Sequence, residues 1–407
     1  MLHTDLTIAL VTSLIPMCVY QNELHDKKRT ILVLTDYYLP GYKSGGPVRT
    51  IANMVEDMSD EYSFRIITRD RDCGDDTQYP GILAGEWMDV GNSKVFYVAP
   101  TITCVYEIVR VIRNTHFDVL YLNSYFSRLM TFVPLLAVRM MWIGAKPVVV
   151  APRGEFSPGA LSVKSIRKRL YTGLVKLFGL YSNVVWQGST KSEMNDILRL
   201  YPNGDVFVAR DLVSTKKCRP FPTRSREVFR LIFLSRITPM KNLAFLLTCL
   251  RRVRARVKLL IYGPVDDPEY WSKCKPLLED VPTNVDVHYK GPIPQEEVAR
   301  ELAASDLLVL PTKGENFGHV IYESLCVGTP VLISDNTPWR GDQSGGCKVC
   351  SLSRPECFVE AIEEAAHLSA EEYRSRRYAA VNYVKTVLKD VDARAENIAL
   401  FSYALRG

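Results

Sequence analysis

Two glutamates stand eight residues apart in a glycine-containing stretch of the second half of the chain. Glu315 follows Gly314 directly, and Glu323 comes five residues after Gly318. The glycines would allow a tight turn into a helix, whose free N–H groups and positive dipole end favour a bound diphosphate. Taken one at a time, each glutamate fits an ordinary helix-terminal or solvated charge as well. The two readings stay open at this point.

An arginine and a lysine occupy a similar place earlier in the same half. Arg236 and Lys241 are five residues apart, directly after the apolar stretch 231–234. Two such cations can converge on one anion, because arginine offers a planar fork of donors and lysine a compact charge. Solvent-facing loop cations are the alternative interpretation.

The first half has a glycine pair after its first apolar stretch. Gly45 and Gly46 follow the stretch 31–35 and directly precede Pro47. Paired glycines permit a close approach of the backbone to a ligand, and proline suits the first turn of a helix. An ordinary turn is the alternative interpretation of this tract taken alone.

Short apolar runs recur along the chain, with helical patterns between them. Such runs are typical of strands that are buried on both faces of a parallel sheet. They lie at 31–35, 64–68, 95–98, 119–122, 147–151 and 184–186 in the first half, and at 231–234, 257–262, 285–289, 307–310 and 331–333 in the second. The alternation predicts an α/β fold with two tandem Rossmann-like domains around a cleft, whose sites lie at the carboxyl ends of the strands.

A polar, basic and proline-containing segment at 214–228 separates the two patterns and is typical of a linker. We therefore expect a first domain at 29–213 and a second domain at 229–385. Residues 1–28 precede the first predicted strand and are expected to form an extension outside the fold.

The composition is that of an ordinary globular protein. The chain has 407 residues, of which 47% are hydrophobic and 24% charged, and this balance excludes disordered and coiled-coil classes. Its net charge of +6 is smaller than a nucleic-acid binder usually carries. Neither half has the Gly-x-Gly-x-x-Gly fingerprint after its first strand, which argues against a nicotinamide or flavin enzyme.

The ten cysteines show no disulfide framework. Most are scattered through apolar runs. Cys347, Cys350 and Cys357 lie close together but lack the second pair or the histidine of a zinc site. A metal or redox role for these three is the minor alternative. Cysteines that stay unpaired predict a reducing cytoplasm.

No apolar stretch of the sequence is suited to span a membrane. The stretch 6–20 is interrupted by polar residues and lacks the basic flank of a signal peptide. Residues 164–178 combine five cations with several leucines and predict a basic amphipathic helix. Such a helix can lie on an anionic leaflet, and a surface helix whose apolar side packs on the sheet is the alternative.

These elements, in this order, resemble the family 4 retaining glycosyltransferases of GT-B fold over roughly residues 29–400. The most specific part is the stretch 314–323, which is similar to the Glu-x7-Glu signature of that family, and the Gly-Thr-Pro-Val motif follows within 326–331. Arg236 and Lys241 look like its diphosphate clamp. The tract 151–159 resembles the acceptor-side loop of members that build cell-surface polysaccharides. The GT-B fold also implies that a final helix, 386–407, packs back toward the first domain.

The resemblance implies a nucleotide-diphosphate sugar as the donor. Glu323 would bind the ribose, Glu315 would face the transferred sugar, and Arg236 with Lys241 would hold the diphosphate. Further donor contacts would come from the loops at two helix N-termini, namely Gly45, Gly46, Asn316, Phe317, Gly318 and His319. The candidates on the sugar and acceptor side are Asn123, Arg153 and Glu155. Asn123 stands where many members have a histidine, and this departure leaves the identity of the donor sugar open.

The resulting hypothesis is a retaining hexosyltransferase that needs no metal and no cofactor. It would move sugar to a hydroxyl of a glycan or a lipid-linked saccharide in surface polysaccharide biosynthesis. A sugar-nucleotide 2-epimerase of the same fold and a non-catalytic nucleotide-sugar binding protein are the alternatives, and no nucleic-acid partner is expected. We expect a cytoplasmic protein that could associate with the inner face of the membrane through residues 164–178.

Overall fold

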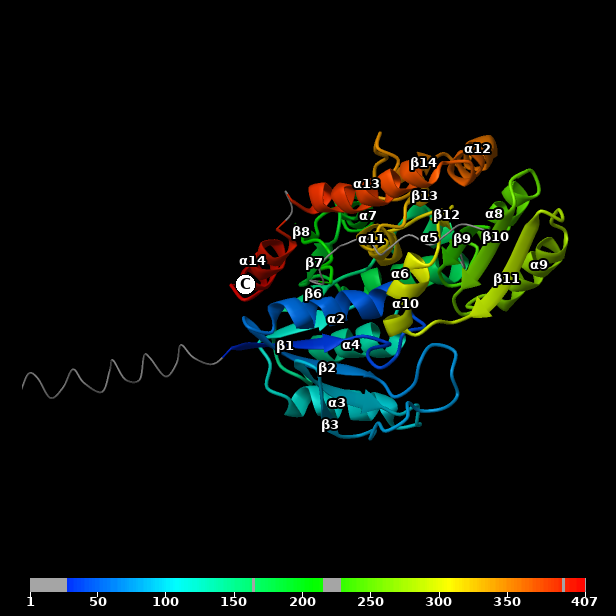
Figure 1. Cartoon of the computed structure of the whole chain (residues 1–407). Coiled ribbons are helices and arrows are strands. Elements are labelled where there is room, and N and C mark those ends of the chain that lie inside the picture. The colour runs from blue at the N-terminus through cyan, green and yellow to red at the C-terminus, as the bar shows by residue number, and fades with distance from the viewer. Residues whose placement is uncertain (1–27, 163–164, 215–227, 390–391, 407) are drawn as a thin grey trace, which may run out of the picture.

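Two domains, each built on a mainly parallel sheet, make up the computed structural model of the chain (Figure 1). The structure describes residues 28–162, 165–214, 228–389 and 392–406. Nearly all of the predicted extension at 1–28, most of the predicted linker at 214–228 and Lys164 of the predicted amphipathic helix lie outside the described residues.

The sheet of the first domain has the strand order β3-β4-β2-β1-β5-β6-β7-β8 within the described residues. Its strands are β1 (Arg29–Leu34), β2 (Tyr62–Arg69), β3 (Trp87–Val90), β4 (Ser93–Val98), β5 (Val119–Leu122), β6 (Val148–Val150), β7 (Val185–Gly188) and β8 (Asp205–Val208). Strand β3 runs antiparallel to β4, whereas β1 pairs in parallel with both β2 and β5. The order therefore reverses between β1 and β5, which is where α/β sheets bind ligands.

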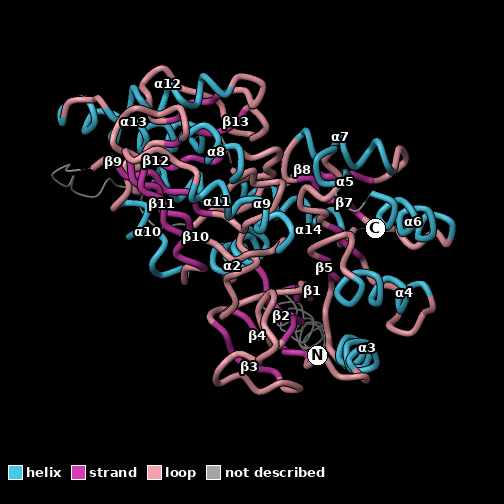
Figure 2. The backbone as a smooth tube through the Cα atoms, turned by 90° about the vertical axis from the view of Figure 1, so that its right-hand side faces the viewer, coloured by secondary structure: helices cyan, strands magenta, loops and turns pink. Residues whose placement is uncertain are grey.

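Helices cover both faces of this sheet, as the alternating side chains of β1 require. Ile31 and Val33 pack with α2 (Gly46–Met58), whereas Leu32 and Leu34 point to the opposite face and pack with α3 (Cys104–Asn114). The second face is also covered by the π-helical turn η1 (Arg128–Phe132), α4 (Val133–Arg139) and α6 (Ser165–Leu177). Figure 2 shows α3, α4 and α6 along its right-hand edge. Within the described part of this half, the structure also has α5 (Pro158–Ser162) and α7 (Lys191–Leu200).

The sheet of the second domain has the order β11-β10-β9-β12-β13-β14 within the described residues, and its paired strands are parallel. Its strands are β9 (Phe229–Leu234), β10 (Val257–Tyr262), β11 (Val285–Gly291), β12 (Leu307–Leu310), β13 (Val331–Ser334) and β14 (Cys347–Cys350). Its helices are α8 (Leu243–Leu250), α9 (Pro268–Glu279), α10 (Gln295–Ala303), α11 (His319–Cys326), α12 (Pro355–Ala366) and α13 (Ala370–Lys389). The order reverses between β9 and β12, as it does between β1 and β5 in the first domain.

The last helix, α14 (Ala393–Ala404), leaves the second domain and packs on the first (Figure 1). Phe401 lies in the core with Tyr62 and Tyr121, with ring centroids 5.3 and 5.9 Å apart. Arg394 reinforces this contact by an ion pair with Asp60 at 2.7 Å. The predicted fold class, two Rossmann-like domains with a returning C-terminal helix, is confirmed.

The expectation of unpaired cysteines is wrong for Cys350 and Cys357, which form a disulfide with each other, and for Cys326, which is also disulfide-bonded. Strand β14 was not predicted, because the run Cys347–Cys350 is short and alternates with a lysine. Its last residue, Cys350, meets the first turn of α12 with a Cα–Cα distance of 5.9 Å to Cys357, which is the usual span of a disulfide. The prediction of a reducing compartment from unpaired cysteines therefore loses its basis.

Among the residues that the structure describes, no helix combines the length and the apolar character that crossing a bilayer requires.

Candidate functional site

The two points at which the strand orders reverse face each other across a cleft of about 990 Å³. Loops that follow β1 in the first domain and β9 and β12 in the second line this cleft, together with the tract around 153–160. The carboxyl ends of the strands in both sheets therefore supply its walls, as the general rule for open α/β sheets requires.

The loop after β12 places Glu315 and the N-terminus of α11 in the cleft. Gly318 is the N-cap of α11 and has a φ of +84°, a left-handed conformation that favours glycine. A Cβ atom at this position would lie 2.8 Å from Ile321 Cδ1 and 3.0 Å from Glu315 Cγ, so a larger residue would displace the glutamate. The unpaired N–H groups of the first turn of a helix attract anions.

The loop after β9 brings Lys241 onto Glu315. Lys241 Nζ lies 2.5 Å from Glu315 Oε2, and both side chains are mostly buried. The main chain supports this contact, because the Lys313 N–H donates to the Met240 carbonyl at 2.8 Å and joins the two loops. Arg236 lines the same cleft but forms its ion pair with Asp266, at 2.8 Å. The structure thus gathers the four predicted charged residues around one cleft, with Lys241 and Glu315 in direct contact.

The glycine pair of the first domain lies opposite α11. Gly45 is the N-cap of α2, with a φ of +69°, and Gly46 and Pro47 begin the helix. A Cβ atom on Gly46 would lie 3.8 Å from the His319 ring, so the N-termini of α2 and α11 meet across the cleft. Two helix N-termini that converge on one space provide N–H donors and positive potential from both domains.

Arg49 is a site residue that the sequence analysis missed. It lies one turn into α2, and its guanidinium donates to Glu323 Oε1 of the second domain at 3.0 Å. Gln295 Nε2 donates to the same oxygen at 3.1 Å. The position of Arg49 one turn after the glycine pair could have marked it as a candidate site residue. Its partner, however, is 274 residues away, and the sequence around Arg49 does not indicate it.

Two further hydrogen bonds join the domains beside this ion pair. Thr50 Oγ1 and His319 Nε2 are 2.9 Å apart, and Asn316 Nδ2 donates to Ser189 Oγ at 2.6 Å. Asn316 also contacts the acceptor-side tract, because a Cβ atom on Gly154 would lie 3.2 Å from its Cβ. Two of the predicted donor-binding residues, Asn316 and His319, therefore also contribute to the interface with the first domain.

The imidazole of His319 is buried between the domains, with 8% of the residue exposed. Burial lowers its pKa to about 3, and the positive charge of Arg49 acts in the same direction. The ring is thus neutral at physiological pH and can both donate and accept a hydrogen bond.

The pH dependence of stability should report this histidine. Between about pH 6.5 and pH 3 the unfolded chain binds a proton at His319 that the folded protein does not bind. The free energy of unfolding should therefore fall as the pH decreases through this window, by about 1.4 kcal/mol per pH unit from this residue. His319→Asn should remove that part of the slope in urea unfolding, whereas the exposed control variant His116→Asn should retain it. An unchanged slope in His319→Asn would contradict the assignment.

Arg153, predicted on the acceptor side, is a buried part of the wall of the cleft. Its guanidinium forms an ion pair with Asp211, donates to the Tyr121 hydroxyl, and donates from Nε to Asn123 Oδ1 at 2.8 Å. Asn123 also donates to Thr35 and is itself buried, so it lies behind Arg153 and is not among the residues that line the cleft. The structure therefore places Asn123 as a residue that positions Arg153.

Glu155 lines the cleft beside Arg153, but its carboxylate binds the loop after β5. Its oxygens accept hydrogen bonds from the Ser124 hydroxyl at 2.9 Å and from the N–H groups of Tyr125 and Phe126 at 2.6 and 3.2 Å. Burial raises the pKa of this carboxyl to about 7, although these donors oppose the shift. The arrangement indicates that Glu155 shapes the loop.

Glu193 is a second residue that the sequence analysis did not single out. It stands in a Thr-x-x-Glu capping pattern, in which Glu193 N–H donates to Thr190 Oγ1 at 3.1 Å. Its carboxylate accepts hydrogen bonds from Gly154 N–H at 2.5 Å and from Ser189 N–H at 2.9 Å. The buried glutamate therefore links the N-terminus of α7 to the acceptor-side tract.

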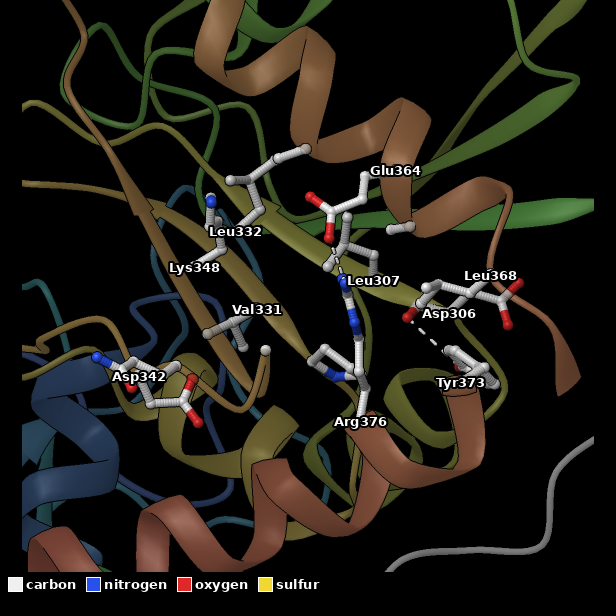
Figure 3. A pocket seen from close by; sticks show the side chains of 15 residues that line it. Asp306, Leu307, Val331, Leu332, Asp342, Lys348, Glu364, Leu368, Tyr373 and Arg376 are labelled. Carbon is white, nitrogen blue, oxygen red and sulfur yellow. Dashed lines mark hydrogen bonds and ion pairs between the residues drawn. The ribbon is translucent and has the colours of Figure 1, made fainter. Parts of the chain in front are cut away.

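A second, smaller cavity of about 390 Å³ lies at the amino ends of β12, β13 and β14, away from the cleft. Figure 3 shows Arg376 of α13 reaching across it to form an ion pair with Glu364 of α12, and Tyr373 bound to the main chain of Asp306. Its position at the opposite edge of the sheet separates it from the residues described above.

The sequence is similar to known proteins over part of its length. Residues 216–380 match the family model of the glycosyl transferases group 1. The chain is 31% identical over 163 residues to a D-inositol 3-phosphate glycosyltransferase of Thermobispora bispora, which covers 35% of this chain and 38% of the relative. It is 30% identical over 169 residues to the protein of the same name from Streptomyces avermitilis, which covers 35% of each chain. The chain therefore spans less than two-fifths of the length of these relatives.

Similar solved structures cover nearly the whole chain at low identity. Sucrose-phosphate synthase from Thermosynechococcus elongatus superposes with a TM-score of 0.70 and 13% identity, over 93% of this chain and all of its own. Anabaena HepE in complex with UDP-glucose gives a TM-score of 0.65 and 14% identity, over 92% of this chain and 98% of its own. The chain thus has the GT-B fold, and its residues 216–380 carry the sequence pattern of the group 1 glycosyl transferases.

Proposed function

We propose that the protein is a retaining, metal-independent glycosyltransferase of family 4. It moves a hexose-type sugar from a nucleotide-diphosphate sugar to a hydroxyl of a glycan or lipid-linked saccharide in surface polysaccharide biosynthesis. The observation that carries the proposal is the contact between Lys241 and Glu315, which lies beside Arg236 and the facing N-termini of α2 and α11.

The chemistry of the transfer explains why these groups would be needed. As the bond between the sugar and the diphosphate breaks, the sugar gains oxocarbenium character and the diphosphate gains negative charge. Lys241, Arg236 and two helix N-termini can stabilise that charge without a metal ion. Because they are held in place by ion pairs and main-chain contacts before the donor binds, little reorganisation would be needed during the reaction.

The acidic residues would orient the donor. In the proposal Glu323 accepts hydrogen bonds from the ribose hydroxyls, at the carboxylate that Arg49 and Gln295 already hold in position. Glu315 lies against Lys241 and would contact the hydroxyls of the transferred sugar while the lysine contacts the diphosphate. Retention is proposed to occur by front-side transfer, in which the departing phosphate helps to remove the proton of the acceptor hydroxyl.

Binding of the donor tests the proposal first. A nucleotide-diphosphate sugar at about 100 times its dissociation constant should stabilise the folded protein by about 2.7 kcal/mol. For domains of this size, this corresponds to a rise of about 5–10 °C in the unfolding temperature. A thermal-shift screen that begins with UDP-glucose should therefore reveal the donor, and a screen in which no nucleotide sugar raises the unfolding temperature would contradict the proposal.

The reaction itself is tested with the donor that this screen identifies. Release of the nucleoside diphosphate should require an acceptor and should proceed at the same rate in EDTA. Activity that EDTA abolishes and manganese restores would exclude the metal-independent clamp. Conversion of UDP-N-acetylglucosamine to its 2-epimer without an acceptor would identify an epimerase instead.

A further inference from the structure

The face of the first domain formed by α3, the end of α4 and α6 carries exposed apolar side chains that have no role in the cleft. The largest group lies on α6, where Ile166, Leu170, Leu174 and Leu177 are 56–79% exposed. Their spacing places them on one stripe of the helix. The opposite side of α6 packs on the domain through Val175, which is 1% exposed, and Tyr171. The sequence left open the alternative that the apolar side of this helix packs on the sheet. That alternative is wrong for these four residues, because they are exposed.

Two neighbouring segments extend this apolar surface. At the end of α4, Met140, Met141 and Trp142 follow one another and are 53%, 68% and 52% exposed. At the start of α3, Ile102 is fully exposed and Tyr106 is 70% exposed. Helices α3 and α4 contact each other, and Figure 2 shows α3, α4 and α6 in one layer along its right-hand edge. Large apolar side chains that gather on one face mark an interaction surface.

The charge of the same face is strongly positive. The segment 101–180, which forms this layer and the strands beneath it, contains eleven lysines and arginines but only three acidic residues. Two of the eleven do not contribute to the described face, because Arg153 lies in the wall of the cleft and Lys164 lies outside the described residues. Of the three acidic residues, Asp118 is paired with Arg29, and Glu155 is bound by the loop after β5. On α6, the exposed Arg167, Arg169 and Lys176 flank the leucine stripe. A helix with cations on both sides of an apolar stripe can bind a bilayer whose anionic headgroups cover an apolar interior.

We propose that this face, made of α3, the turn after α4 and α6, docks the first domain on an anionic lipid bilayer. The leucine stripe and Trp142 would enter the boundary between headgroups and acyl chains, while the flanking cations would bind anionic headgroups. A protein partner with an acidic, apolar face is the competing occupant, and so is a second copy of this chain. The charge of the face disfavours a second copy, because two identical positive faces repel each other.

The position of α6 relative to the cleft gives this surface a role in the reaction proposed above. Helix α5 lines the cleft through Pro158, Gly159 and Ala160, and it directly precedes α6 in the chain. Lys168 of α6 donates to the Ala160 carbonyl at 2.7 Å, which couples the two helices. A bilayer beneath α6 would therefore lie next to the acceptor side of the cleft. This last step rests on the proposed function, whereas the docking itself does not.

Co-sedimentation with lipid vesicles tests the docking. The full chain should bind vesicles of phosphatidylcholine and phosphatidylglycerol, and should bind vesicles of phosphatidylcholine alone at least tenfold more weakly. The double variants Leu170→Asn/Leu174→Asn and Arg167→Glu/Arg169→Glu should each weaken binding to the anionic vesicles by about tenfold or more. The matched controls Tyr378→Ser and Arg374→Glu, at exposed positions of α13 in the second domain, should bind as the wild type does.

Fluorescence tests whether the turn after α4 belongs to the same surface. Tryptophan emission should shift to shorter wavelength when anionic vesicles are added, and Trp142→Phe should remove that shift. A shift that persists in Trp142→Phe would show that the turn after α4 does not enter the bilayer. It would overturn the definition of the surface as α3, the turn after α4 and α6 together.

Two results would overturn the proposal as a whole. One is equal binding of the wild type and both α6 double variants to anionic vesicles. The other is a dimer that the Leu170→Asn/Leu174→Asn variant dissociates, in a protein that binds neither kind of vesicle. Donor binding, measured by thermal shift, is an independent test of the proposed function, because the α6 residues lie outside the cleft. A protein that binds a nucleotide sugar but no vesicles would contradict only the docking surface. A protein that binds vesicles but no nucleotide sugar would contradict the proposed function and support the surface.

Discussion

Replacement of Lys241 by alanine should lower the turnover number by about 10²–10³-fold. The lysine is the cation in direct contact with Glu315, and in the proposed reaction it stabilises the charge that develops on the departing diphosphate. The interaction would be stronger in the transition state than in the ground state, so the loss should appear in kcat more than in KM. Arg236→Ala should act in the same direction, since Arg236 lines the same cleft. Steady-state kinetics with the identified donor would measure both effects.

Two exposed cations of the second domain provide matched controls for these variants. Lys290 is an exposed lysine on β11, outside the cleft, and Lys290→Ala should keep wild-type kinetics. Arg251 forms a surface ion pair with Asp280 at 3.1 Å, comparable to the pair between Arg236 and Asp266, and Arg251→Ala should also be neutral. All four variants should fold, with unchanged circular dichroism. Near wild-type transfer by both Lys241→Ala and Arg236→Ala would refute the clamp.

Replacement of Arg153 by methionine should have the largest effect on stability. It would leave the carboxylate of Asp211 buried without its cation, and breaking a buried ion pair in this way typically costs about 3–5 kcal/mol. The unfolding temperature should fall by roughly 10 °C, measured by differential scanning calorimetry. The cost arises mainly from the charge left behind. The double variant Arg153→Met/Asp211→Leu should therefore recover most of the loss.

A surface ion pair of the same domain gives the comparison. Arg29 pairs with Asp118 at 3.1 Å, but its side chain is 65% exposed. Arg29→Met should therefore cost no more than about 1 kcal/mol. A double variant that is less stable than Arg153→Met would show that Arg153 and Asp211 contribute separately, and would contradict the ion-pair explanation.

Most strands of both sheets are predictable because buried parallel strands are short, continuous apolar runs. The runs at 119–122 and 307–310 coincide with β5 and β12 residue for residue. Strands β3, β8 and β14 escape this reasoning, since they lie at the ends of their sheets and carry polar residues such as Asp89, Asp205 and Lys348. Local pattern is a strong signal only where both faces of a strand are buried.

The site residues also fall into those that local sequence identifies and those that it does not. Gly45, Gly318 and the charged residues of the strand-to-helix loops are recognisable, because turns and helix N-termini impose their requirements within a few residues of sequence. Asn123 and Glu155 were predicted from a resemblance as ligand-side groups, and the structure gives both of them partners within the protein. A side chain in a motif can bind its own fold or a ligand, and its neighbours in space decide between the two.

Local sequence determines most helices and strands of this protein. It also places the charged groups of the site in the loops at the carboxyl ends of the strands. The pairing of those groups depends on the packing of the two domains: Arg49 reaches Glu323, Thr50 reaches His319, and Asn316 reaches Ser189. Periodicity likewise identifies α6 as amphipathic, but its exposed side is known only once the domain is packed. The reason is physical. Helix, strand and turn preferences act over a few residues, whereas these contacts join positions that are far apart along the chain and become neighbours only when the chain has folded.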